Sequence, residues 1–137
     1  MAEKPATIKL RIVFDGLGHI GHGRIELLEL IGKHGSIAKA AKAMDMSYKR
    51  AWYLIDEFSA MFSVPLVERH HGGKGGGAAV LTDFGETLVR EYRAMEQSTL
   101  ASFAPQLKML QRRLRKDEGA PPKTPEAPTR RRRARSP

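Results

Sequence analysis

Two short helical patterns, each preceded by a serine and separated by a two-residue break, constrain the fold more than any other feature of the sequence. Ser36 and Ser47 are good N-cap residues, because a serine hydroxyl can accept a free backbone N–H at a helix start. Residues 37–44 carry small apolar side chains that allow another helix to approach closely. Larger apolar residues recur at helical spacing after Ser47, and Pro65 stops the pattern. The pair predicts a helix-turn-helix whose second helix spans residues 47–62.

The residues ahead of this pair predict a strand, a break and a further helix. Residues 7–14 alternate and are rich in β-branched side chains, which favours a strand. Four glycines within residues 16–23 then interrupt the chain. A broad apolar stripe begins near Arg24, and Gly32 or Gly35 closes that helix.

A glycine-rich loop around Lys74 joins two short strand candidates, residues 66–70 and 78–82, and the three segments predict a hairpin. The loop does not fit a P-loop, because Glu68 stands where the first glycine belongs and Gly75 follows the lysine in place of Ser or Thr. No helix opens after the loop, which excludes a dinucleotide site as well. Two interpretations stay open: a hairpin tip, or a wing whose backbone approaches DNA phosphates. Its position after a helix-turn-helix favours the wing.

A long helix follows the hairpin. Either Thr82 or Asp83 caps it, and Asp83 and Glu86 have the spacing of a capping box. Pro105 is expected to kink or end this helix, and a second helical segment is expected over residues 106–116.

The predicted fold class is therefore mainly α with a small β-hairpin: a winged helix-turn-helix plus a long C-terminal dimerisation helix at about residues 83–116. We expect one domain over residues 1–116 and a disordered basic tail, rich in proline and arginine, over residues 117–137. The net charge of +9 is uneven, since ten of the 24 Lys and Arg residues lie from Gln111 onward against three acidic residues. The tail could bind DNA phosphates without sequence preference, or it could be a solvated end.

The first turn of the second helix carries the main DNA-reading candidates, because a recognition helix enters the major groove by its N-terminal residues. Lys49 and Arg50 suit guanine edges or phosphates, and Tyr53 lies about one turn further on the outward side. A solvated basic turn is the alternative. Trp52 is spaced for the core. The full set of expected DNA-binding residues, with a wing over residues 70–78, is Ser36, Ser47, Tyr48, Lys49, Arg50, Tyr53, Arg69, His71, Gly73, Lys74 and Gly75.

Two segments, GSIAKAAKAMDMSYKRAWYLIDE and LVERHHGGKGGGAAVLTDFGETLV, resemble the N-terminal DNA-binding domain of the ModE family of molybdate-responsive transcription regulators. The resemblance covers roughly Gly23 to Glu96, and more distantly the chain is similar to the LysR-type winged helix. The resemblance implies a homodimer that binds an inverted repeat. It also implies DNA contacts by Ser47, Tyr48, Lys49 and the wing around Lys74. It does not imply a DNA contact by Arg50. Full-length ModE proteins continue into two small molybdate-binding modules, and this chain has a Pro/Arg tail in their place. We therefore do not extend molybdate binding to it.

Other classes of function are less well supported. The sequence has no cysteine, which excludes disulfides and thiolate zinc sites. The spacing of His19 with His22, and the adjacent pair His70 and His71, could suggest a metal sensor, but no carboxylate is placed to complete such a site. No catalytic constellation or cofactor motif stands out, so we expect neither an enzyme nor a bound cofactor. Without a membrane-length apolar run or a secretory signal, we expect a cytoplasmic protein.

The leading hypothesis is a sequence-specific, dimeric transcription regulator that binds double-stranded DNA. A nucleoid or architectural protein that coats DNA, and a winged-helix module that binds proteins, are the alternatives. The sequence leaves open the operator, the direction of regulation, and any effector or partner protein.

Overall fold

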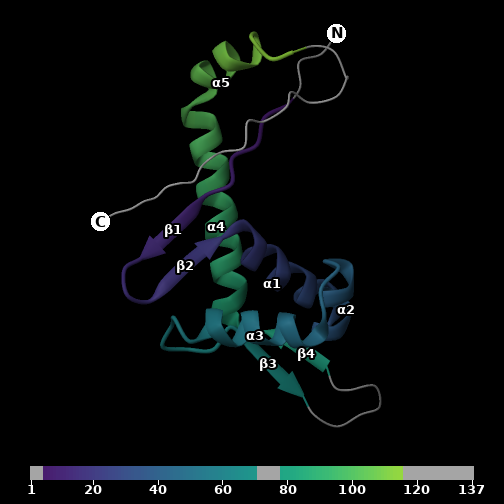
Figure 1. The fold of residues 1–137 in the computed structure, drawn as a ribbon. Coiled ribbons are helices and arrows are strands. Elements are labelled where there is room, and N and C mark those ends of the chain that lie inside the picture. The colour runs from purple at the N-terminus through teal and green to yellow at the C-terminus, as the bar shows by residue number, and fades with distance from the viewer. Residues whose placement is uncertain (1–4, 71–77, 116–137) are drawn as a thin grey trace, which may run out of the picture.

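The computed structural model describes residues 5–70 and 78–115. The shorter helices near the N-terminus and the paired strands gather at one end, and a long helix projects from them with a short helix at its far end (Figure 1). In chain order the elements are β1 (Arg11–Phe14), β2 (Gly18–Gly21), α1 (His22–His34), α2 (Ile37–Ala43), α3 (Tyr48–Ser59), β3 (Val67–His70), β4 (Ala78–Leu81), α4 (Asp83–Ser102) and α5 (Ala104–Gln111).

The core lies where α1, α2 and α3 pack together. Four side chains of α1 form its centre, and the small face of α2 packs against them through Ala40 and Ala41. Gly35 ends α1 with φ 68°, a left-handed conformation that costs glycine little. Gly35 is thus the closing residue, and Gly32 lies within the helix. The buried members on α1 are Ile25, Leu27, Leu28 and Ile31.

Both serine caps are confirmed. The Ser36 hydroxyl accepts from Lys39 N at 3.1 Å, and the Ser47 hydroxyl accepts from Arg50 N at 3.0 Å. Asp45 has φ 58°, so the break between α2 and α3 passes through a left-handed residue. The end of α3 was placed too late, because the chain leaves the helix after Ser59 in tight turns instead of continuing to residue 62.

The glycine-rich residues after the first strand form a second strand that the sequence reading missed. β2 pairs antiparallel with β1 in the register Arg11↔Gly21 to Phe14↔Gly18. Gly16 has φ 82° at the turn, and Leu17 N donates to Phe14 O at 2.9 Å. The expected strand over residues 7–14 is correspondingly shorter, and α1 begins at His22, two residues before the predicted start.

The predicted hairpin between residues 66 and 82 is confirmed within one residue at either end. β3 and β4 pair antiparallel from Val67↔Leu81 to His70↔Ala78. A backbone bond ties this hairpin to the end of α1, since Ala79 N donates to Gly35 O at 3.0 Å. Thr82 N donates to Leu66 O at 3.0 Å and closes the base of the hairpin. The glycine loop itself lies outside the described residues.

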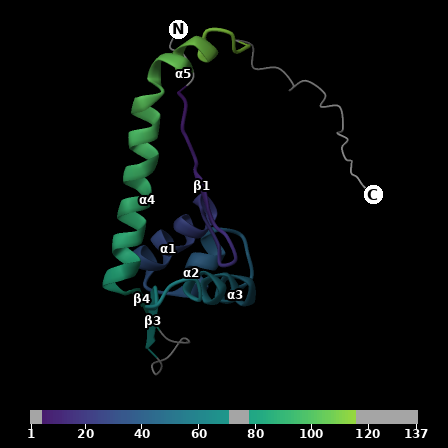
Figure 2. The same ribbon diagram turned by 90° about the vertical axis from the view of Figure 1, so that its left-hand side faces the viewer.

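The long helix α4 begins at Thr82, whose hydroxyl accepts from Gly85 N at 3.0 Å. The capping box expected between Asp83 and Glu86 is therefore wrong, because the cap is one residue earlier. Pro105 lies in the first turn of α5, so the second segment starts and ends earlier than residues 106–116. Figure 2 shows the extended segment ahead of β1 running roughly alongside α4.

Candidate nucleic-acid interface

The exposed face of α3 is set by the side chains that the helix buries. Ala51, Ile55 and Phe58 point into the core and fix the rotation of the helix about its axis. Tyr48 and Tyr53 are left 51% and 57% exposed. The basic pair Lys49 and Arg50, which follows Tyr48 in the first turn, is exposed as well. The first two turns of α3 thus present two cations and two aromatic rings to solvent.

The wing strand and α3 meet through a cation–π contact. The Arg69 guanidinium lies 4.5 Å from the centroid of the Trp52 ring. Trp52 was expected in the core; it is partly buried and packs against the edge of the core, with Arg69 over its ring. Such a contact is worth about 0.5–2 kcal/mol and helps to hold β3 against α3.

The remaining predicted contact residues fall into two groups. Ser36 is a helix cap whose hydroxyl is engaged at the start of α2, and it is only partly exposed. The other four, His71, Gly73, Lys74 and Gly75, lie outside the described residues. The structure therefore brings together Ser47, the first turn of α3, Tyr53 and Arg69.

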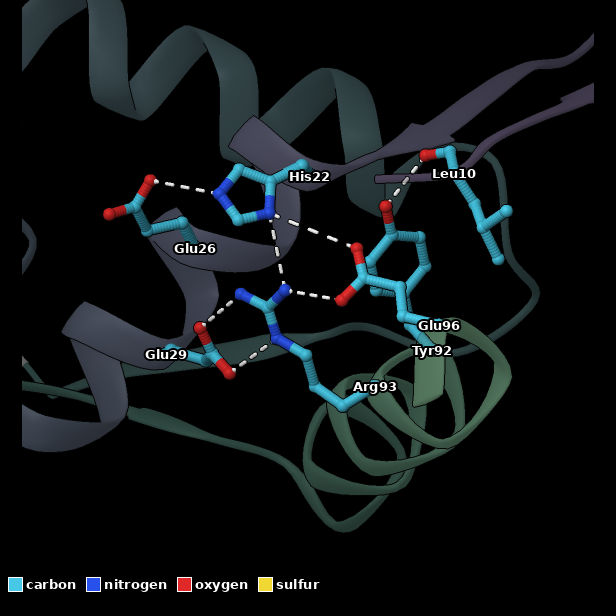
Figure 3. A network of polar contacts seen from close by, with 7 residues as sticks. All are labelled: Leu10, His22, Glu26, Glu29, Tyr92, Arg93 and Glu96. Atoms are coloured by element: carbon cyan, nitrogen blue, oxygen red, sulfur yellow. Dashed lines mark hydrogen bonds and ion pairs between the residues drawn. The ribbon is translucent and has the colours of Figure 1, made fainter. Parts of the chain in front are cut away.

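A polar network that sequence reasoning missed ties α4 to α1 (Figure 3). Arg93 donates to both carboxylate oxygens of Glu29, at 2.7 and 2.9 Å, and to Glu96 at 2.7 Å. Its Nη1 lies 3.2 Å from Nδ1 of His22. The Tyr92 hydroxyl donates to Leu10 O at 2.6 Å and so joins the N-terminal segment to the same helix.

The pKa shifts in this network reflect burial and ion pairing. Burial works against ionisation of Glu96, but the hydrogen bond and charge of Arg93 outweigh it, so the pKa of Glu96 is lowered. The Glu29 carboxylate is the main cause of the raised pKa of Arg93. Burial raises the pKa of Tyr92. The three-residue spacing of Arg93 and Glu96 on α4 was the only sequence signal for this network. Their partner Glu29 is far away in the chain, so its contact with Arg93 could not be predicted from spacing.

The histidines do not gather into a metal site in the described part of the chain. His22 lies 3.6 Å from a Glu26 oxygen and 3.9 Å from a Glu96 oxygen. Over residues 5–70 and 78–115, no three His, Asp or Glu side chains are arranged to hold a metal ion. Within the same ranges, no helix has the length and apolar character that crossing a bilayer requires.

Comparison with known proteins supports a helix-turn-helix assignment. Residues 23–86 match the family described as bacterial regulatory helix-turn-helix protein, lysR family. The fold is similar to that in a crystal structure of the CbnR DNA-binding domain with DNA, with a TM-score of 0.51 and 20% identity over 64% of this chain and 95% of that one.

Similar curated proteins include molybdenum proteins and ModE transcriptional regulators. The chain is 38% identical over 96 residues to the molybdenum-pterin-binding protein MopA of Rhodobacter capsulatus, covering 70% of this chain and 36% of MopA. It is 49% identical over 73 residues to the molybdenum transport protein ModE of Azotobacter vinelandii, covering 53% and 27%. It is 45% identical over 80 residues to the DNA-binding transcriptional dual regulator ModE of Escherichia coli, covering 58% and 30%. The chain thus spans about a third of the length of these relatives. Residues 23–86 thus match a lysR-family regulatory helix-turn-helix, and this part of the chain is similar in sequence to part of the ModE transcriptional regulators.

Proposed function

We propose that the chain is a sequence-specific DNA-binding transcription regulator that acts as a homodimer. The observation that carries this proposal is the first turn of α3, where Ser47 caps a helix whose buried face is locked in the core while Lys49 and Arg50 face solvent. A helix end presented in this way can enter the major groove, where arginine and lysine bind guanine edges. Homology to ModE regulators supports DNA as the partner.

The wing is proposed to bind the DNA backbone while α3 reads the bases. Arg69 sits over Trp52, so its charge lies next to α3. On this proposal the wing over residues 70–78, with His71, Gly73, Lys74 and Gly75, contacts phosphates. Such contacts position the protein on DNA and carry no sequence information. Sequence specificity would therefore come from the side chains of α3, Tyr53 among them. Ser36, at the start of α2, would add a phosphate contact.

The long helix and the N-terminal hairpin are proposed to form the dimer interface. Large apolar side chains lie exposed on both, as well as on α5, and a second copy would cover them. A two-fold dimer of this kind would place two recognition helices on an inverted repeat, about one helical turn apart. The exposed residues are Val13, Phe14, Leu17, Met95, Phe103, Met109, Leu110 and Leu114.

The remaining parts of the proposal follow from DNA as the partner. We place the DNA-binding and dimerisation unit within residues 1–116, and we assign to residues 117–137 a non-specific basic tail. A regulator of bacterial type acts where the chromosome is, so the cytoplasm is the proposed location. We assign no catalytic residues and no cofactor.

The test compares Lys49→Ala with Lys108→Ala, an exposed lysine on α5 at the opposite end of the molecule (Figure 1). Affinity for the preferred duplex and for an unrelated duplex is measured by fluorescence anisotropy at one salt concentration. Loss of a base contact at Lys49 is expected to weaken specific binding by roughly 5- to 150-fold and to reduce discrimination. The Lys108 variant should bind as the parent does.

Equal weakening on both duplexes would contradict base reading by Lys49 and favour a protein that coats DNA. No effect of Lys49→Ala on either duplex would contradict the placement of α3 in the groove. A parent chain that binds no duplex would favour the protein-interaction alternative.

A further inference from the structure

A cavity of about 300 Å³ lies between the N-terminal strand, the start of α1 and the turn between α2 and α3. One wall carries Lys9, Arg11 and His19. The apolar part of the lining comes from the helix-turn-helix, through Met44, Met46 and Leu54. Its volume is at the lower end of the range for cavities that bind small molecules, so it suits a compact ligand.

Lys9 and Arg11 supply the positive charge, and His19 adds an imidazole whose lowered pKa favours its neutral form. Lys9 lies two residues before Arg11, just ahead of β1, and both line the cavity. The antiparallel pairing sets Arg11 opposite Gly21, which has no side chain, and His19 shares the face of Gly21 two residues earlier. Arg11 and His19 therefore share one face of the β1–β2 hairpin, where Gly21 contributes no side chain and the His19 ring lies beside it.

Within the described ranges, Lys9 and Arg11 form no ion pair with a carboxylate, whereas the charge of Glu57 acts on His19. Arg24 also lines the cavity, and its guanidinium forms an ion pair with Glu57 at 3.0 Å. The side chains of Lys9, Arg11 and His19 make neither a hydrogen bond nor an ion pair with the residues that the structure describes. Burial, followed by the charges of Arg24 and Arg11, lowers the pKa of His19, as expected in a positive environment.

The start of α1 adds to this environment. Gly21 is the N-cap and offers no side chain to the free N–H groups, and the first turn of the helix holds no acidic residue. Backbone donors of Gly23 and Arg24 thus remain at the cavity edge, where an anion is favoured by the helix dipole.

We propose that this cavity binds a small organic carboxylate. The carboxylate would lie against Arg11, Lys9 and the start of α1, and a short apolar body would lie on the methionines and Leu54. Met46 directly precedes Ser47, the cap of α3. A ligand in the cavity would therefore contact the residue next to the start of the recognition helix. An effect of the carboxylate on DNA affinity rests on the proposed function, whereas binding of the carboxylate to the cavity does not.

The test titrates the full chain, labelled with ¹⁵N, with benzoate and follows backbone amide shifts. Benzamide is the neutral probe of the same shape, and inorganic phosphate is the anion without an apolar body. Saturable shifts are expected at Gly21, Gly23 and Met46, with propagated shifts at Ser47. Benzamide and phosphate should each bind at least about tenfold more weakly than benzoate.

Arg11→Gln is the decisive variant, because Arg11 is exposed on a short strand and the substitution keeps a polar side chain. It should weaken benzoate binding about tenfold or more. Arg90→Gln on α4, an exposed arginine away from the cavity, is the matched control and should leave binding unchanged. Lys9→Gln is the second variant, in case Arg11→Gln perturbs the spectrum of the free protein.

Three results would overturn the proposal: no saturable shifts at the cavity with benzoate up to about 10 mM, equal binding of benzamide, or unchanged benzoate affinity in both cavity variants. Equal binding of phosphate would overturn the apolar part of the assignment. These readouts need no DNA, so they separate failure of this site from failure of the proposed function.

Discussion

Replacing Arg93 tests whether the buried network fixes the long helix to the DNA-binding domain. Arg93→Gln removes the paired hydrogen bonds to Glu29 and the bond to Glu96. Glu96 is only 7% exposed, and its Oε2 already lacks a hydrogen-bond partner in the described structure. The variant therefore leaves a carboxylate in the interior without the cation that stabilises its charge.

The magnitude follows from the burial of the partners. Breaking a fully buried ion pair costs about 3–5 kcal/mol. The side chains of Arg93 and Glu29 are 30% and 37% exposed, so water reduces the penalty and we expect about 2 kcal/mol of lost stability. For a domain of this size that lowers Tm by roughly 10 °C.

The loss should depend on pH, with a sign set by Glu96. In the parent its pKa is lowered, so its contribution is present above the unfolded pKa and disappears as pH falls through the folded pKa. Without Arg93, burial should raise that pKa, and the penalty should vanish when the carboxyl becomes protonated. The stability gap between parent and variant is therefore larger at pH 7 than at pH 4.

Thermal unfolding followed by circular dichroism at one fixed protein concentration measures this gap, because a dimer would make Tm depend on concentration. Arg90→Gln is the control, since Arg90 is exposed on the same helix and bonds only Thr87 at 3.3 Å among the described residues. Adding Glu96→Gln to the Arg93 variant should recover part of the stability at pH 7. The reasoning is refuted if Arg93→Gln and Arg90→Gln unfold alike, or if the gap does not change with pH.

Three further variants test the helix junction, the recognition helix and the tail. Gly85→Ala should cost about 1–3 kcal/mol in thermal unfolding, because its Cβ would meet the Leu66 carbonyl oxygen, whereas Gly23→Ala, which faces open space, should be neutral or stabilising. Ser47→Ala should cost about 1 kcal/mol and weaken DNA binding by fraying the start of α3; unchanged values in both assays would contradict its role as a cap. Deleting residues 117–137 should lower affinity for all duplexes and flatten its salt dependence, and a changed preferred site would contradict this.

The helix starts of the DNA-binding core could be predicted because capping is local chemistry. Ser36 and Ser47 each bond an N–H three residues ahead, so their role can be read from a short stretch of sequence. Which of Thr82 and Asp83 caps α4 could not be predicted from the neighbouring residues alone. The Thr82 hydroxyl also donates to Pro65 O at 2.7 Å, and this contact across the hairpin favours Thr82 as the cap.

The elements that were missed depend on pairing between distant or glycine-rich segments. β2 has only the side chains of His19 and Ile20 between glycines, so its sequence lacks the alternation that marks a strand. The strand forms because these residues pair with β1. In the candidate site, the exposed position of Tyr53 follows from helical period alone. The contact of Arg69 with Trp52, by contrast, requires the fold.

The central claim, specific recognition of an inverted repeat by a dimer through α3, is tested most directly by selecting bound fragments from a random DNA pool with purified protein at near-physiological salt. We predict recovery of an inverted repeat with half-sites about one helical turn apart. Tight, salt-sensitive binding without an enriched motif would contradict the claim and favour a protein that coats DNA.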